Sequence, residues 1–172
     1  MNISATRDLE LTTASTAETL ELGKKLGRLL AAGDVVALTG PLGAGKTYLT
    51  KGIALGLGLA DSRSVRSPTF VLVSEHEGRL KLYHVDAYRL RSARDLESLG
   101  SSEFLFSEGV TVVEWAERVK EALPAEHLWV ECRHAGETKR TFRFSARGER
   151  AEELLRKFAA SARSSSPLQG ED

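Results

Sequence analysis

A glycine-rich stretch from Gly40 to Thr47 has the residue types and spacing of a phosphate-binding loop. Its sequence, GPLGAGKT, fits the pattern G-x-x-x-x-G-K-[ST], in which backbone N–H groups surround phosphate oxygens. The lysine of this pattern, Lys46, meets the β- and γ-phosphates, and the Thr47 hydroxyl binds Mg²⁺. We therefore predict that the chain binds a nucleoside triphosphate. The other predicted contacts come from the loop itself: Gly40, Leu42, Gly43, Ala44 and Gly45.

Two acidic residues at the ends of predicted strands are candidates for the chemistry. Asp86 closes LKLYHVD, and Glu114 closes VTVVE. Ligands of open α/β sheets bind beyond the carboxyl ends of the strands, so both acids could reach the phosphates. We expect one to hold Mg²⁺ through water and the other to orient the attacking water. Glu114 is the stronger candidate because a fully apolar strand is typical of a central position, although either acid could be a solvated strand-end charge.

Three further positions have two interpretations each. Ser67 and Thr69 lie in the loop DSRSVRSPTF, where they could sense the γ-phosphate and the metal or form an ordinary turn before a strand. Trp115 follows Glu114 directly and could belong to the core or flank the nucleotide. His84 lies within a strand, where we expect a structural role.

The elements that must position these residues follow from hydrophobic periodicity, caps and turn residues. Ser15, with Glu18 three positions later, predicts a capping box and a helix start. The pattern predicts helices at 15–33, 46–58, 92–99, 104–106, 116–122 and 149–162, and strands at 34–39, 70–74, 80–86, 110–115, 127–132 and 141–146. The strands at 70–74 and 80–86 are expected to form an antiparallel hairpin.

This order of elements predicts an α/β fold: a single P-loop NTPase domain with a mixed β-sheet and helices on both faces. We assign residues 1–148 to this ATPase domain and 149–172 to a C-terminal helix and flexible tail, because the last twelve residues have little apolar content.

Composition limits the setting in which the protein works. The 24 basic and 24 acidic side chains cancel, so no overall field attracts nucleic acid or a membrane surface. The single cysteine, Cys132, lies in an apolar run and is expected to be buried and reduced. Neither a secretory leader nor a membrane span is visible, so we predict a cytoplasmic protein with no membrane partner.

ATP is the expected nucleotide because the chain lacks the N-K-x-D and T-K-x-D runs that read guanine in small GTPases. Three function classes remain open: a switch-like ATPase, a P-loop small-molecule kinase and a nucleotide-binding module without turnover. The kinase alternative depends on Arg89, Arg91 and Arg94, which could form a mobile lid.

Four segments together carry a family resemblance: GPLGAGKTYLTKGIALGLG, SPTFVLVSEHEG, LYHVDAYRL and VVEWAERV. In order and spacing the chain resembles the bacterial TsaE family from residue 15 to about residue 124. The H-x-D-x-Y-R-L and V-E-W motifs are far more specific than the phosphate loop alone. The resemblance implies a compact mixed-sheet domain that binds ATP and Mg²⁺ and hydrolyses ATP slowly.

The same resemblance implies partners and a pathway. It implies action with the TsaD and TsaB proteins in the threonylcarbamoyl modification of the adenosine beside the anticodon, in tRNAs that read codons beginning with adenine. Position by position, Lys46 and Thr47 match the family's phosphate and metal residues, Asp86 its Walker B-like acid and Glu114 the acid next to the site. Thr16 matches a position near the nucleotide, and the segment 67–69 matches a switch-like region.

Overall fold

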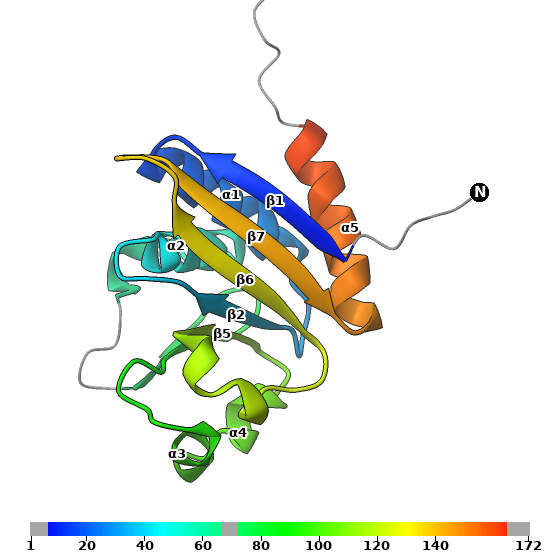
Figure 1. Ribbon diagram of the computed structural model, residues 1–172. Helices are drawn as coiled ribbons and strands as arrows, with labels where there is room; N and C mark the ends of the chain where they lie inside the picture. Colours follow the sequence, from blue (N-terminus) through cyan, green and yellow to red (C-terminus); the bar gives the residue numbers. More distant parts are fainter. Residues whose placement is uncertain (1–6, 67–71, 165–172) are drawn as a thin grey trace, which may run out of the picture.

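A computed structural model describes residues 7–66 and 72–164 and contains one mixed sheet of seven strands (Figure 1). The strand order is β1-β7-β6-β2-β5-β4-β3. The strands are β1 (Asp8–Thr13), β2 (Val35–Thr39), β3 (Val73–His76), β4 (Leu82–Asp86), β5 (Val110–Glu114), β6 (His127–His134) and β7 (Arg140–Arg147). β2 lies in the middle, parallel to both β5 and β6. The predicted mixed α/β sheet is confirmed, and so is the hairpin, because β3 pairs antiparallel with β4.

Helices cover both faces of this sheet, as predicted. They are α1 (Thr16–Leu29), α2 (Lys46–Gly56), α3 (Ala93–Ser98), α4 (Ser102–Leu105) and α5 (Glu149–Ser164), with short 3-10 helices η1 (Ser62–Ser64), η2 (Ala116–Arg118) and η3 (Lys120–Ala122). The long helices α1, α2 and α5 pack on one face, and the short ones α3, α4 and η2 pack on the other. α5 belongs to the same core as the sheet, through Leu154, Leu155 and Phe158.

The predicted helix at 116–122 is wrong. This segment forms the two 3-10 turns η2 and η3, because the backbone leaves helical geometry at both ends of η2. Trp115 enters η2 in the left-handed region, with φ of 59°, and Val119 has φ of −130°. Both Ala116 and Val119 are fully buried. Val119 lies between the two turns outside helical geometry, so an uninterrupted helix does not form.

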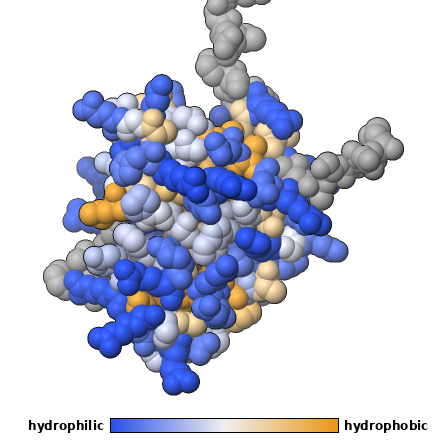
Figure 2. All heavy atoms as spheres, in the orientation of Figure 1, coloured by the Kyte–Doolittle hydropathy of each residue, from blue (hydrophilic) through white to orange (hydrophobic). Residues whose placement is uncertain are grey.

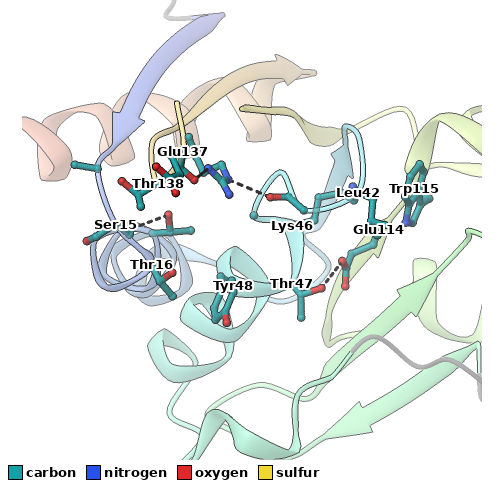
Figure 3. A pocket seen from close by; sticks show the side chains of 15 residues that line it. Ser15, Thr16, Leu42, Lys46, Thr47, Tyr48, Glu114, Trp115, Glu137 and Thr138 are labelled. Carbon is teal, nitrogen blue, oxygen red and sulfur yellow. Dashed lines mark hydrogen bonds between the residues drawn. The ribbon is translucent and has the colours of Figure 1, made fainter. Parts of the chain in front are cut away.

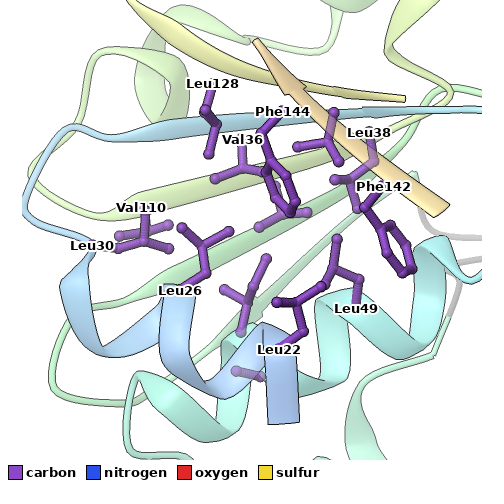
Figure 4. Close-up of a cluster of buried hydrophobic side chains, with 14 of the residues drawn as sticks. Leu22, Leu26, Leu30, Val36, Leu38, Leu49, Val110, Leu128, Phe142 and Phe144 are labelled. Carbon is purple, nitrogen blue, oxygen red and sulfur yellow. The ribbon is translucent and has the colours of Figure 1, made fainter. Parts of the chain in front are cut away.

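β2 is buried on both sides, which is why its residues are almost all apolar. Val36 and Leu38 point toward α1 and α2, where they meet Leu26 and Leu49 in the larger core cluster (Figure 4). The alternate residues of the strand face α3 and α4 instead. A strand fixed by packing on both faces holds the loop that follows it in a defined position.

Glycines bring the backbones of α1 and α2 into direct contact. Gly23 of α1 and Gly52 of α2 face each other, and one turn further on Gly27 faces Gly56. A Cβ atom added at Gly52 would lie 2.3 Å from the carbonyl oxygen of Leu20, closer than any real contact. We call these four residues the glycine contact. It fixes α1, and hence the start of α1, relative to the helix that follows the phosphate loop.

The outer face of β1, β7 and β6 is polar (Figure 2). Asp8, Glu10 and Arg143 are exposed there, while the intervening residues of the same strands point inward to the core. Among the residues that the structure describes, no helix has the length and apolar character needed to cross a membrane.

Candidate functional site

The loop between β2 and α2 has a backbone that requires glycine. Gly40 has φ of 131°, and a Cβ atom at this position would lie 2.1 Å from the carbonyl oxygen of Cys132. Gly45, with φ of 101°, is the N-cap of α2 and supplies no side-chain acceptor to its first turn. The N–H groups of that turn therefore remain at the positive end of the helix dipole, where anions are favoured.

Lys46 is held inside this loop. Its Nζ atom donates to the carbonyl oxygens of Gly40 and Pro41, the latter at 2.9 Å, and lies 4.1 Å from the centre of the Trp115 ring. Only 5% of the side chain is exposed. Burial lowers the pKa of Lys46, and the nearby Glu114 acts in the opposite direction. The ammonium group therefore lies next to the pocket, where it is bound by two uncharged carbonyl oxygens.

Glu114 is a buried acid bound at both carboxylate oxygens. Thr47 Oγ1 donates to Glu114 Oε1 at 3.0 Å, and His84 Nε2 contacts Glu114 Oε2. The exposed fractions of the Glu114 and His84 side chains are 2% and 0%. The structure therefore brings together the loop hydroxyl, the strand-end acid and the strand histidine.

Asp86 lies beside Glu114 at the ends of two parallel strands, where the two acids are register partners of β4 and β5. Its Oδ1 atom accepts a hydrogen bond from the backbone N–H of Tyr88 at 2.9 Å. Burial raises the pKa of Asp86, partly opposed by this hydrogen bond, and the neighbouring Glu114 raises it further. The two acids therefore lie side by side at the carboxyl ends of neighbouring parallel strands.

Trp115 lies at the boundary between the core and the pocket, so it shows features of both interpretations. It packs against the second core cluster, and it also lines the pocket. Tyr88 tilts against it, with ring centres 5.0 Å apart. Trp115 is also the one non-glycine residue in the described chain with a positive φ. Strained backbone of this kind is concentrated at functional sites.

A cavity of about 680 Å³ opens between the loop and the start of α1 (Figure 3). Its floor is formed by the loop and the first residues of α2, and one wall is formed by the end of β5. The facing walls come from segments far apart in the sequence. They are Ala14, Ser15, Thr16 and Thr19 on one side, and Glu137, Thr138 and Arg140 on the other. Ser15 is fixed there by the predicted capping box, because its Oγ accepts from Glu18 N–H at 3.1 Å.

Sequence reasoning missed the wall formed by the β6–β7 turn. Arg140 Nε donates to the carbonyl oxygen of Gly43 at 3.1 Å, and His134 Nε2 donates to that of Leu42, also at 3.1 Å. These residues are more than ninety positions from the loop in sequence. No local motif marks them, and only the pairing of β6 with β2 brings them to the loop.

The predicted site residues are otherwise placed as follows. Lining the cavity are Thr16, Leu42, Gly43, Gly45, Lys46, Thr47, Glu114 and Trp115. Gly40, Ala44 and Asp86 lie next to it in the loop and at the end of β4 without lining it. Ser67 and Thr69 fall outside the described residues. Cys132 is fully buried, as predicted, and burial raises the pKa of its thiol.

The donor set fits a nucleotide with Mg²⁺. A loop of left-handed glycines offers N–H groups, a lysine lies at its edge, and a hydroxyl contacts a carboxylate. Mg²⁺ is usually bound by one or two protein oxygens together with substrate phosphates, and Thr47 with the strand-end acids provides such oxygens.

Fold and site together define a class: a single mixed α/β domain in which a glycine-rich loop joins a central parallel strand to a helix, the arrangement typical of phosphate-binding loops. The sequence model of the family described as threonylcarbamoyl adenosine biosynthesis protein TsaE matches residues 13–142, well over half of the chain. The chain belongs to the TsaE family.

Individual relatives agree with this assignment. The tRNA threonylcarbamoyladenosine biosynthesis protein TsaE of Bacillus subtilis is 42% identical over 149 residues, which cover 86% of this chain and 92% of that protein. The protein of the same name from Treponema pallidum is 45% identical, covering 69% of this chain and 87% of its own. The crystal structure of Bacillus subtilis YdiB superimposes with a TM-score of 0.76 at 35% identity, covering 90% of this chain and 96% of that one.

Proposed function

We propose that this protein binds ATP with Mg²⁺ in the cavity beside the phosphate loop and hydrolyses it. The observation that carries the proposal is the hydrogen bond from Thr47 Oγ1 to Glu114 Oε1, with 3.0 Å between the two oxygens. It lies beside the glycine loop that also holds Lys46. A metal-binding hydroxyl, a carboxylate and a mobile cation are the groups that phosphoryl transfer to water requires.

Each side chain has a defined task in this proposal. Lys46 leaves the carbonyl oxygens of Gly40 and Pro41 and binds the β- and γ-phosphates, exchanging neutral partners for anionic ones. With Mg²⁺ bound, the Thr47 hydroxyl oxygen would turn from Glu114 and serve as a ligand of the metal. Glu114 then accepts a hydrogen bond from the attacking water and orients it. Mg²⁺, when bound, would neutralise negative charge on the phosphate oxygens.

Asp86 is proposed as the second carboxylate of the site. Its place beside Glu114 on the neighbouring parallel strand supports a contact with the metal through water. The resemblance to the family's Walker B-like acid at this position points to the same role. Glu114 keeps the role of orienting water, because Glu114 lines the cavity and Asp86 does not.

We further propose that ATP turnover serves threonylcarbamoyl modification of tRNA, on the adenosine beside the anticodon in tRNAs reading codons that begin with adenine. Membership of the TsaE family supports this step, since the relatives are named for threonylcarbamoyladenosine biosynthesis. The proposed partners are TsaD and TsaB, with tRNA reached through their complex. We place this activity in the cytoplasm, where tRNA is modified.

The experiment that tests this uses ATP labelled at the γ-phosphate, with the protein alone and with TsaD, TsaB and tRNA. Release of labelled phosphate that increases with the partners supports the proposal. Transfer of label to a small molecule would indicate a kinase instead, although Arg89, Arg91 and Arg94 do not line the cavity. Bound but unhydrolysed ATP under both conditions would indicate a binding module, and full turnover by Lys46→Ala would exclude the phosphate-loop mechanism.

A further inference from the structure

His84 is a polar residue in the interior of the sheet that the proposed mechanism does not use. It lies within β4, fully buried, opposite Val112 of β5. Its Nε2 atom contacts Glu114 Oε2, while its Nδ1 atom has no hydrogen-bond partner among the described residues. All of the polar contact made by this ring in the described structure is therefore directed at a single carboxylate oxygen.

Glu114 depends on such a contact because a buried carboxylate needs partners that replace water. Among the described residues it has one hydrogen-bond partner at each oxygen, Thr47 at Oε1 and His84 at Oε2. The two partners differ in kind. Thr47 is the first-turn residue of α2 that the proposed mechanism turns toward the metal, whereas His84 belongs to a strand paired on both sides.

We infer that His84 is a positioning residue for Glu114. It holds Oε2 in place, so that Oε1 keeps facing the cavity when Thr47 turns away and can accept the hydrogen bond of the attacking water. This inference rests on the proposed ATP hydrolysis, and it goes beyond it by assigning the residue that sets the orientation of the acid. Small errors in the orientation of the carboxylate lower the rate of the chemical step, because a general base must lie within hydrogen-bond distance and direction of the attacking water.

Two amide substitutions separate this role from simple filling of the core. The amide nitrogen of glutamine lies at about the reach of histidine Nε2, so His84→Gln retains a donor toward Glu114. The amide nitrogen of asparagine lies at about the reach of Nδ1, so His84→Asn has a donor in the wrong place. Both replacements put a neutral amide into the same buried position, and this makes them matched controls for each other.

The experiment measures kcat, KM for ATP and melting temperature for the full chain with its partners. We expect His84→Asn to lower kcat at least tenfold while KM stays within about threefold, and His84→Gln to recover most of the lost kcat. Should His84→Asn fail to fold, His84→Leu fills a similar volume without a donor and takes its place in the comparison.

A double substitution tests whether His84 acts through Glu114. If it does, adding His84→Asn to Glu114→Gln causes no further loss of kcat. Equal kcat for the Asn and Gln variants, or additive losses in the double variant, would overturn the inference. A wild-type protein that releases no phosphate with its partners present would instead overturn the proposed function and, with it, the role assigned to His84.

Discussion

The ammonium group of Lys46 lies 4.1 Å from the centre of the Trp115 ring while it donates to two loop carbonyl oxygens. In the proposed nucleotide complex the same group binds phosphates, so the two residues must separate. Trp115 is therefore placed to report on the position of Lys46, because a cation over an indole ring interacts with its π-electrons.

The first prediction uses this contact. The chain has two tryptophans, and Trp129→Phe leaves Trp115 as the only one. Addition of MgATP should change its fluorescence in the same direction as Lys46→Met does without nucleotide, since both remove the cation from the ring. The measurement is a fluorescence titration, and changes of opposite sign would contradict the prediction.

The second prediction concerns Glu114. Glu114→Gln keeps the size of the side chain and removes its negative charge, so it should lower kcat by about 10²- to 10³-fold, within the range of general-base catalysis. ATP affinity should change less than about tenfold, because binding depends mainly on the loop. Glu121→Gln, exposed on η3, is the matched control and should leave both unchanged. Equal loss of turnover and affinity would assign Glu114 to the metal instead.

The third prediction follows from the raised pKa of Asp86. A carboxyl whose pKa is higher in the folded state binds its proton more tightly there, so the ionised form costs stability. This cost is absent below the ordinary pKa of aspartate and grows as the pH rises through the window up to the raised value. Asp86→Asn should therefore raise the melting temperature of the nucleotide-free protein at pH 7 and leave it unchanged in acid. Thermal unfolding from pH 3 to 8 checks this, and a pH-independent increase would count against it.

The fourth prediction tests the glycine contact. Alanine normally favours a helix over glycine, yet Gly52→Ala places a Cβ atom 2.3 Å from the carbonyl oxygen of Leu20. We expect a loss of about 1–3 kcal/mol in the free energy of unfolding, which is typical of overpacking. Gly136→Ala is the control, because its Cβ atom would meet nothing closer than 3.5 Å. Chemical denaturation measures both, and equal stability of the two variants would show that α1 shifts without cost.

The fifth prediction concerns the wall that sequence reasoning missed. Arg140→Met keeps an unbranched side chain but removes the hydrogen bond to the carbonyl oxygen of Gly43, together with those that Arg140 Nη1 donates to carbonyl oxygens of the turn itself. A hydrogen bond contributes about 1 kcal/mol net. We expect its loss to lower the free energy of ATP binding by about that amount, which is about a fivefold weaker affinity. Arg143→Met, on the exposed outer face of β7, should have no effect in the same calorimetric titration. If both variants bound like wild type, the turn would have no part in holding the loop.

Local signals predicted the elements that carry the phosphate loop. β2 and α2 are identified by an apolar run, glycines and a helical repeat that are close together in the sequence. Ser15 starts α1 through a hydrogen bond to the backbone N–H of Glu18, only three positions away. The placement of Asp86 and Glu114 at one edge of the sheet can also be predicted from the sequence, because parallel strands align their carboxyl ends.

What the sequence did not predict depends on contacts between distant segments. Arg140 and His134 reach the loop only through the pairing of β6 with β2, and the partner of Glu114, His84, lies thirty positions away on the neighbouring strand. The failure at 116–122 has a different cause, because the backbone of Val119, with φ of −130°, leaves helical geometry in the middle of the segment. Tertiary packing decides such short segments, and propensity is a weak guide to them.

The facing walls of the cavity have a consequence for how the protein is made. One wall comes from residues 14–19, and the other from residues 137–140. A ribosome synthesises the second wall long after the first, and β1 finds its partner β7 only when the later segment has emerged. A partly synthesised chain can thus display the glycine loop but cannot enclose a nucleotide on both sides until the β6–β7 turn has left the ribosome.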